Sequence, residues 1–484
     1  MADQATAEAP AAPPRAKGPG IIMHDRYRLD PDTPLSDLDL PSAKAYLCED
    51  RREAGRLLFC LICTPGLPTR ADALVALKGV ETPGILPLVD YGIIDWPPLG
   101  QRTTAIIYER PLGGRVADSH TSADFRVSEY ELPKLIIEPL SGALLDFQNR
   151  GITHRAIRPN NLFFMDAEKT DIVLGDCVTA PPGFDQPLVF EPVERAMSSP
   201  AGRGDGDSRD DLYAFGVTLV FMLLGTNPLA RMSEDALINT KLEQGTYTTL
   251  CGRERVPVPM LEPLRGMLSD DAHERWGPDE LELWISGRKL TPIQKKATPK
   301  AESGFRFAGH DHVNRRTLAR AMTRNVTDAA KELRAIRTLD EKEIAEQNAT
   351  PKRARGPQHD EGPKLTKSGK LYAWVRRSLK EPDLAELIAG AVESATLKKG
   401  TPEGSDDYLV AKVAMMFDPE GPIRYKGVGM MADALGPVTA VEYLRKETFK
   451  VPREILALDL GVFWCAAQLK SNPEASAHLK VFGQ

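Results

Sequence analysis

The chain has 484 residues, 42% of them hydrophobic, which is enough for two to four domains with real cores. Its 62 Lys and Arg residues against 68 Asp and Glu residues give a formal charge of −6. This overall charge gives no reason to expect nucleic-acid or membrane binding. The Ala- and Pro-rich start carries no apolar core of signal-peptide length, and the longest apolar stretch, 212–225, is too short to span a bilayer comfortably. We therefore expect a cytoplasmic protein with no nucleic-acid or membrane partner.

The predicted elements begin with a β-rich part after a flexible N-terminus at residues 1–24. Alternating and apolar runs separated by turn residues predict strands, with one short helical pattern among them. The strands are at 43–50, 56–63, 85–94 and 103–110, and the helix is at 71–80. Cys60 and Cys63 form C-x-x-C, but they lie inside the apolar run L-L-F-C-L-I-C, so we favour a buried strand over a metal or redox site.

The spacing of apolar residues then becomes helical from 130 to 149, and two short strands follow at 162–164 and 171–176. Residues 210–290 are predicted to be mostly helical. Beyond them we expect a linker at 291–304, a small strand–helix segment at 305–348, a disordered linker at 349–370 and a helical domain at 371–484. Three local features in this part are interpreted as structural: His310–His312 as a polar turn, Gly427–Gly429 as a turn between helices, and Trp464 as helix core.

A set of short motifs appears in one order along the strand-then-helix part. His154-Arg155-Ala156 is followed by four residues and Asn161, then by Asp176-Cys177-Val178, then by Pro192-Val193-Glu194. Protein kinases carry H-R-D-x-x-x-x-N, D-F-G and A-P-E in this order. Residues 25–290 therefore resemble a protein kinase-like domain, with a β-rich N-lobe and a helical C-lobe. With Asp211 at the start of a buried helix and Arg275 near the end, the chain resembles a bacterial-type Ser/Thr pseudokinase.

The resemblance fails at the residues on which phosphoryl transfer depends. Ala156 stands where the family has its catalytic aspartate, and Leu61 stands where the third strand carries a lysine. The span from Asp30 to Lys44, which corresponds to the Gly-rich loop, contains no glycine and several aspartates. We therefore expect no catalytic residue, and no cofactor, in a scaffold or regulator that binds partner proteins through its C-lobe and its C-terminal domain.

Asp176 and Asn161 match the two metal ligands of the family, and Arg158 is the nearest candidate for a phosphate contact. They keep an alternative open, a residual phosphoryl or nucleotidyl transferase that uses ATP with Mg²⁺ or Mn²⁺. A third hypothesis makes the C-terminal helical domain the working part. The resemblance also implies structural roles for His154, Arg155 and Asp211, and a buried ion pair between Glu194 and Arg275.

Overall fold

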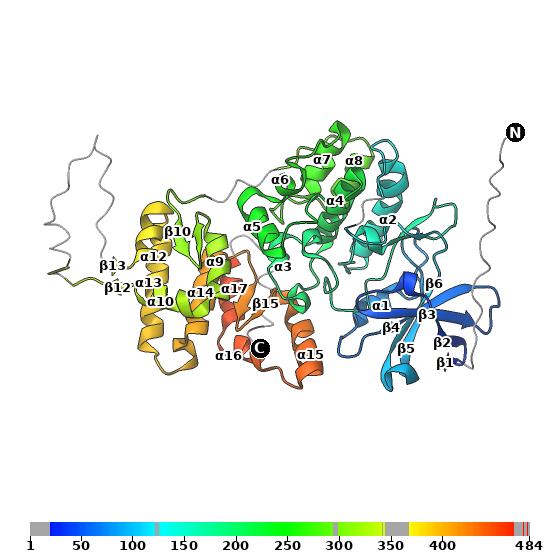
Figure 1. The fold of residues 1–484 in the computed structure, drawn as a ribbon, viewed down its shortest axis with the longest axis horizontal. Coiled ribbons are helices and arrows are strands. Elements are labelled where there is room, and N and C mark those ends of the chain that lie inside the picture. The colour runs from blue at the N-terminus through cyan, green and yellow to red at the C-terminus, as the bar shows by residue number, and fades with distance from the viewer. Residues whose placement is uncertain are drawn as a thin grey trace.

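The computed structural model describes residues 20–121, 125–293, 299–340, 342–343, 367–468, 478 and 482. Within these residues, a β-rich region at the N-terminal end is followed by many helices (Figure 1). Figure 1 shows the N-terminal sheet, a helical middle part and a C-terminal part in succession along the long axis of the molecule. The chain is therefore a mixed α/β protein.

The N-terminal sheet has six antiparallel strands in the order β1-β2-β3-β4-β6-β5. Helix α1 packs beside it. Strand β4 is buried along almost its whole length, because its seven residues are all apolar and both faces of the sheet are covered. The elements are β1 (Ile21–Met23), β2 (Tyr27–Pro34), β3 (Ala43–Asp50), β4 (Leu57–Cys63), α1 (Ala71–Leu77), β5 (Leu88–Trp96) and β6 (Gln101–Glu109).

The predictions for this sheet are confirmed for β3 to β6 and for α1. Cys60 and Cys63 are free, buried thiols in β4, as the apolar run indicated. Strands β1 and β2 were not predicted, and Ile21–Met23 lie in the segment that was expected to be flexible. The reason is that β2 reads Y-R-L-D-P-D-T-P, which is rich in residues that are rare in strands, and β1 is a short edge strand. Residues 1–19 of that segment lie outside the described residues.

The middle part surrounds one helix, α4, which is apolar on all sides after its first turn and is buried from Asp210 to Leu223. A helix that is apolar on all sides belongs inside a protein. Asp207 caps its start, and Gly225, with φ +71°, ends it in a left-handed conformation. The elements here are β7 (Gly114–Arg115), α2 (Glu138–Asn149), β8 (Leu162–Phe164), β9 (Ile172–Leu174), α3 (Val193–Ala196), α4 (Ser208–Leu224), α5 (Glu234–Gln244), α6 (Thr246–Cys251), α7 (Val258–Met267) and α8 (Pro278–Ile285).

The C-terminal part is mainly helical and contains three small antiparallel strand pairs. Its strands are β10 (Phe305–Phe307), β11 (His310–His312), β12 (Arg337–Thr338), β13 (Lys367–Ser368), β14 (Ile423–Tyr425) and β15 (Val428–Met430). Its helices are α9 (Arg315–Arg324), α10 (Val326–Arg334), α12 (Lys370–Ala373), α13 (Pro382–Leu397), α14 (Asp406–Phe417), α15 (Leu435–Lys446), α16 (Lys450–Ala457) and α17 (Leu460–Gln468).

Two predictions for this part are wrong in detail. Gly427 and Gly429 belong to the β14–β15 hairpin rather than to a turn between helices, and His310–His312 form strand β11 rather than a turn. Strands this short, three residues each, carry too little alternation to be recognised from sequence. Lys367–Ser368 form β13 inside the segment expected to be disordered, whose residues 349–366 lie outside the described residues.

The two predicted segments 305–348 and 371–484 share one hydrophobic core. One hydrophobic cluster runs from Ala301 to Phe417 and contains residues of α9, α10, α13 and α14. A second cluster joins α14, β14 and α17 and includes Ala201 of the middle part. Trp464 is buried in this second cluster, as expected. Among the helices of the described residues, none has both the length and the apolar character needed to cross a membrane.

Candidate functional site

The loop Thr153–Asn161 runs from α2 to β8, and the buried carboxylate of Asp211 holds its backbone. Asp211 accepts hydrogen bonds from the backbone N–H groups of His154 and Arg155, each at 2.7 Å. Burial raises the pKa of Asp211 to about 6, against the charge of Arg155 and the two backbone donors. Ala156 follows with only a methyl group, so the loop offers no proton acceptor at this position.

His154 is a neutral packing group in this loop. Its Nε2 atom lies 3.0 Å from the carbonyl oxygen of Gly175, and its ring meets the edge of Phe147 at 5.3 Å between centroids. Burial lowers the pKa of His154 to about 3, because the imidazolium would lose its hydration. The histidine therefore joins the loop to the end of β9.

Asn161 uses both of its amide hydrogens to join two backbone segments. Its Nδ2 donates to the carbonyl oxygen of Ala156 at 2.9 Å and to that of Asp176 at 2.8 Å. Its Oδ1 is buried and has no hydrogen-bond partner among the described residues. Asn161 and Asp176 are thus brought together by a backbone contact.

Both carboxylate oxygens of Asp176 are engaged by protein hydroxyls. Oδ1 accepts from the Tyr108 hydroxyl at 2.7 Å, and Oδ2 accepts from the Thr179 hydroxyl at 2.6 Å. Burial raises the pKa of Asp176, and these hydrogen bonds oppose the shift in part. A cation at this carboxylate would have to displace the two donors. Among the described residues, no group of three or more His, Cys, Asp or Glu side chains is arranged to hold a metal ion.

The β2–β3 loop, residues 35–42, is folded into the space beside this carboxylate. Leu35, Leu38 and Leu40 are 5%, 2% and 7% exposed and belong to the same hydrophobic cluster as residues of β4, β8 and β9. The Arg115 guanidinium fixes the loop by donating to the carbonyl oxygens of residues 37 and 39, at 2.8 and 2.6 Å. The leucines of the loop therefore pack into the core, whereas residues 36, 37 and 41 are exposed.

Ser42, at the end of this loop, ties it to the segment after Asp176. Its hydroxyl lies 2.8 Å from the Thr179 hydroxyl and also donates to the Asp185 carboxylate. The cavity that remains between the loop, Ala156 and Asp176 has a volume of about 20 Å³. Such a volume holds about one water molecule, whereas small-molecule sites usually measure roughly 300–1,000 Å³.

The two arginines of the loop are buried and face different partners. Arg155 donates to Glu191 at 2.7 Å, and both side chains are almost fully buried. Arg158 donates to the amide oxygen of Gln186 at 3.2 Å. Burial lowers the pKa of Arg158 to about 10. Neither guanidinium points to open space, because Arg155 and Arg158 are each 3% exposed.

Arg275 lies at the centre of a charged cluster at the start of α4. Its Nη2 donates to Glu194 at 3.1 Å, its Nη1 to Asp210 at 2.8 Å, and its Nε to the Ser269 carbonyl at 2.9 Å. Arg195 also donates to Asp210, at 2.6 Å. The neighbouring guanidinium groups hold the pKa of Asp210 at about 2 in spite of burial. The structure thus brings together Glu194 and Arg275, the pair that the resemblance implied.

The C-terminal part packs directly on the segment after α3, residues 197–206. Ser199 and Gly429 are joined by two hydrogen bonds, from Ser199 N to Gly429 O at 2.8 Å and from Gly429 N to Ser199 Oγ at 3.0 Å. Met431 N donates to Gly202 O at 2.8 Å. Asp433 accepts from Gly206 N at 2.9 Å and from Arg195 at 3.2 Å. Residues far apart in sequence therefore share one interface.

Sequence reasoning missed three features of this site. They are the hydrogen bond from Tyr108 to Asp176, the packing of the β2–β3 loop and the contact between Gly202 and the β14–β15 hairpin. The spacing of Leu35, Leu38 and Leu40 was the one available signal, because three leucines in a loop without glycine indicate burial rather than a phosphate-binding backbone. The other two contacts join residues 68 and more than 200 positions apart.

No protein-family model matches this chain, and no curated protein sequence matches it. Among solved structures, the chain is similar to Rad53 residues 1–466, determined in complex with AMP-PNP. The match has 16% sequence identity and a TM-score of 0.39. It covers 54% of this chain and 65% of that chain.

Proposed function

We propose that residues 25–290 form a catalytically inactive protein kinase-like domain, and that the chain is a scaffold or regulator that binds partner proteins. The observation that carries this proposal is the cleft beside Asp176. Leu40 of the buried β2–β3 loop borders it, two hydroxyls engage the carboxylate, and the remaining cavity is about 20 Å³. A nucleotide would need several hundred Å³ and a free metal ligand.

The kinase-like assignment is supported by contacts of this chain's own residues. In that family a helix aspartate supports the catalytic-loop backbone, and an arginine pairs with the glutamate of the A-P-E position. Asp211 has the first of these contacts, with the N–H groups of His154 and Arg155. Arg275 has the second, with Glu194. Phosphoryl transfer depends on placed charges, and Ala156 and Leu61 supply none.

The partner surface that we propose lies on the C-terminal part rather than on the segment 197–206, which the β14–β15 hairpin covers. Helices α15 and α16 and the turn between them expose large apolar side chains. Tyr443, Leu444 and Phe449 are 54%, 51% and 46% exposed, and the Tyr443 and Phe449 rings lie 6.4 Å apart. Neighbouring exposed apolar side chains of this size are typical of protein-binding surfaces.

The experiment that tests the inactive cleft is a thermal-shift titration of the full chain with ATP, alone and with Mg²⁺ or Mn²⁺. A ligand that binds only the folded state stabilises it by roughly 2.7 kcal/mol at about 100 times its dissociation constant. We expect no shift at millimolar nucleotide. A metal-dependent shift that Asp176→Ala abolishes would instead favour the residual transferase that uses Asp176 and Asn161.

The proposed partner surface is tested by substitution in a capture assay. Phe449→Asp places a charge on the exposed apolar surface of α15 and α16, and we expect it to abolish capture of proteins that the unaltered chain retains. Leu397→Asp is the matched control, because Leu397 is 84% exposed at the end of α13 and is not part of that surface. Equal capture by the two variants would exclude this surface.

A further inference from the structure

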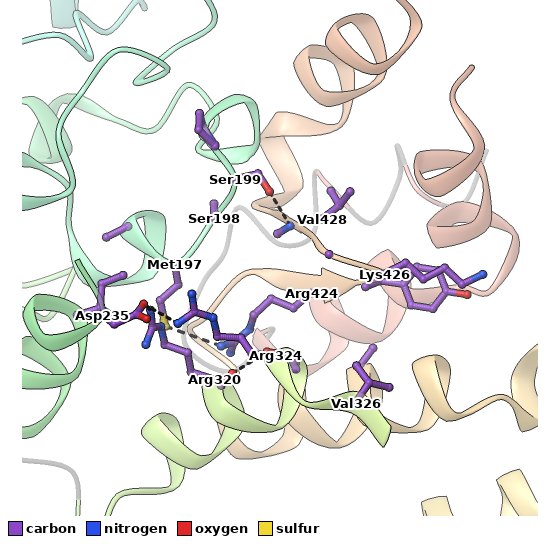
Figure 2. A pocket seen from close by; sticks show the side chains of 18 of the residues that line it. Met197, Ser198, Ser199, Asp235, Arg320, Arg324, Val326, Arg424, Lys426 and Val428 are labelled. Carbon is purple, nitrogen blue, oxygen red and sulfur yellow. Dashed lines mark hydrogen bonds and ion pairs between the residues drawn. The ribbon is translucent and has the colours of Figure 1, made fainter. Parts of the chain in front are cut away.

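A second cavity, of about 350 Å³, lies where the middle part meets the C-terminal part (Figure 2). Its lining comes mainly from the segment after α3, helices α5, α9 and α14, and the β14–β15 hairpin. Its volume is within the range of small-molecule sites. This cavity is separate from the cleft beside Asp176.

Positive charge exceeds negative charge in the lining of this cavity. Five cationic side chains line it, against three acidic ones. Arg320 and Arg324, one turn apart on α9, both donate to the single carboxylate of Asp235, each at 2.5 Å. Figure 2 shows Arg320, Arg324 and Arg424 gathered beside Asp235 and Met197. One carboxylate therefore balances only one of the two guanidinium charges on α9.

Arg424 is buried, and two of its nitrogen atoms lack a good acceptor. Its Nη2 donates to Asp418 at 2.9 Å, and Asp418 also accepts from Arg316, which pairs in addition with Glu420 at 3.1 Å. Its Nη1 meets only the sulfur of Met197, at 3.8 Å, and a thioether is a weak acceptor. Its Nε has no hydrogen-bond partner among the described residues. A buried guanidinium with free donors is costly unless an anion completes its contacts.

Ser198 adds a neutral donor to the same wall. Its hydroxyl is buried and has no partner among the described residues. Apolar side chains, among them Ile238 and Val410, form another part of the lining. The cavity thus combines unsatisfied donors for an anion with an apolar surface for an organic group.

We propose that this cavity binds the phosphoryl group of a small phosphomonoester. A phosphomonoester carries roughly 1.5 to 2 negative charges at pH 7 and three acceptor oxygens, which matches the excess of guanidinium donors. Planar guanidinium groups recognise phosphate oxygens in pairs. The volume leaves room beside the phosphoryl group for a small organic body against Ile238 and Val410.

The test is calorimetric titration of the full chain with inorganic phosphate and with phenyl phosphate, at constant ionic strength. We expect saturable binding that weakens on the order of tenfold in Arg324→Gln, the cost of one charge-assisted hydrogen bond. The Arg324 side chain is 54% exposed and Arg320 retains Asp235, so this variant should fold. Ser198→Ala should weaken binding less. Arg102→Gln is the control, because Arg102 is 70% exposed on the N-terminal sheet.

The two probes separate the two sources of a phosphoryl group. Tighter binding of phenyl phosphate supports an organic phosphomonoester, whereas equal binding shows that the cavity takes free phosphate. The proposal is overturned if neither probe binds saturably. It is also overturned if Arg324→Gln binds as well as Arg102→Gln, because the anion would then lie elsewhere.

Discussion

Replacing Arg275 by Met should destabilise the middle part of the chain by about 3 kcal/mol or more. The side chain is 1% exposed and makes three hydrogen bonds, to Glu194, Asp210 and a backbone carbonyl. Removing one partner of a buried ion pair typically costs about 3–5 kcal/mol, because the other charge is left without compensation. We expect the lower end of this range, since Asp210 keeps Arg195 at 2.6 Å and Glu194 retains some contact with water.

The assay is equilibrium unfolding in urea, followed by circular dichroism and by tryptophan fluorescence, with Trp276 next to the substituted residue as a reporter. Coincident transitions by the two probes are needed before a free energy of unfolding is assigned. Arg150→Met is the matched control. Arg150 pairs with Asp146 at 2.8 Å on the surface of α2, and an exposed pair contributes less than about 1 kcal/mol. An Arg275→Met loss no greater than the control would refute the reasoning.

Three further changes test other parts of the structure. The pKa of His154 falls from 6.5 to about 3 on folding, so stability is full above pH 6.5 and falls by about 1.4 kcal/mol per pH unit as pH drops towards 3. His154→Asn should flatten that part of the curve in pH-dependent unfolding. Leu38→Ala, which opens the β2–β3 loop, should cost about 2–5 kcal/mol in the same assay. Gly202→Ala should increase protease cleavage between the middle and C-terminal parts, because its Cβ would lie 2.0 Å from Gly429 O. Gly142→Ala, with open space around its Cβ in α2, should not.

The sequence predicted most of the regular elements, because apolar periodicity is a local property. The run L-L-F-C-L-I-C predicted β4, and the apolar stretch from Leu212 predicted the buried helix α4. Strand β2 could not be predicted in this way, since its prolines and aspartates oppose a strand and its pairing with β3 overrides them. Pairing with β3, rather than the local sequence, therefore makes this segment a strand.

At the candidate site, too, the sequence predicted where residues lie but not which residues they contact. The order of motifs located His154, Asn161 and Asp176 within one region of the fold. It gave no indication of which donors engage the Asp176 carboxylate, because the hydrogen bond from Tyr108 joins residues 68 positions apart. Arg158 was a candidate for a phosphate contact, and its burial against Gln186 depends on packing that the loop sequence does not encode.

Two glycines allow the C-terminal part to pack closely on the middle part. Gly202 and Gly204 allow the segment after α3 to approach the β14–β15 hairpin so closely that a Cβ at either position would lie 2.0 Å from an atom of the C-terminal part. The segment after α3 is therefore covered by the C-terminal part, and the cavity beside Asp176 is only about 20 Å³. Both observations support the proposal that this chain binds other proteins rather than transferring phosphate.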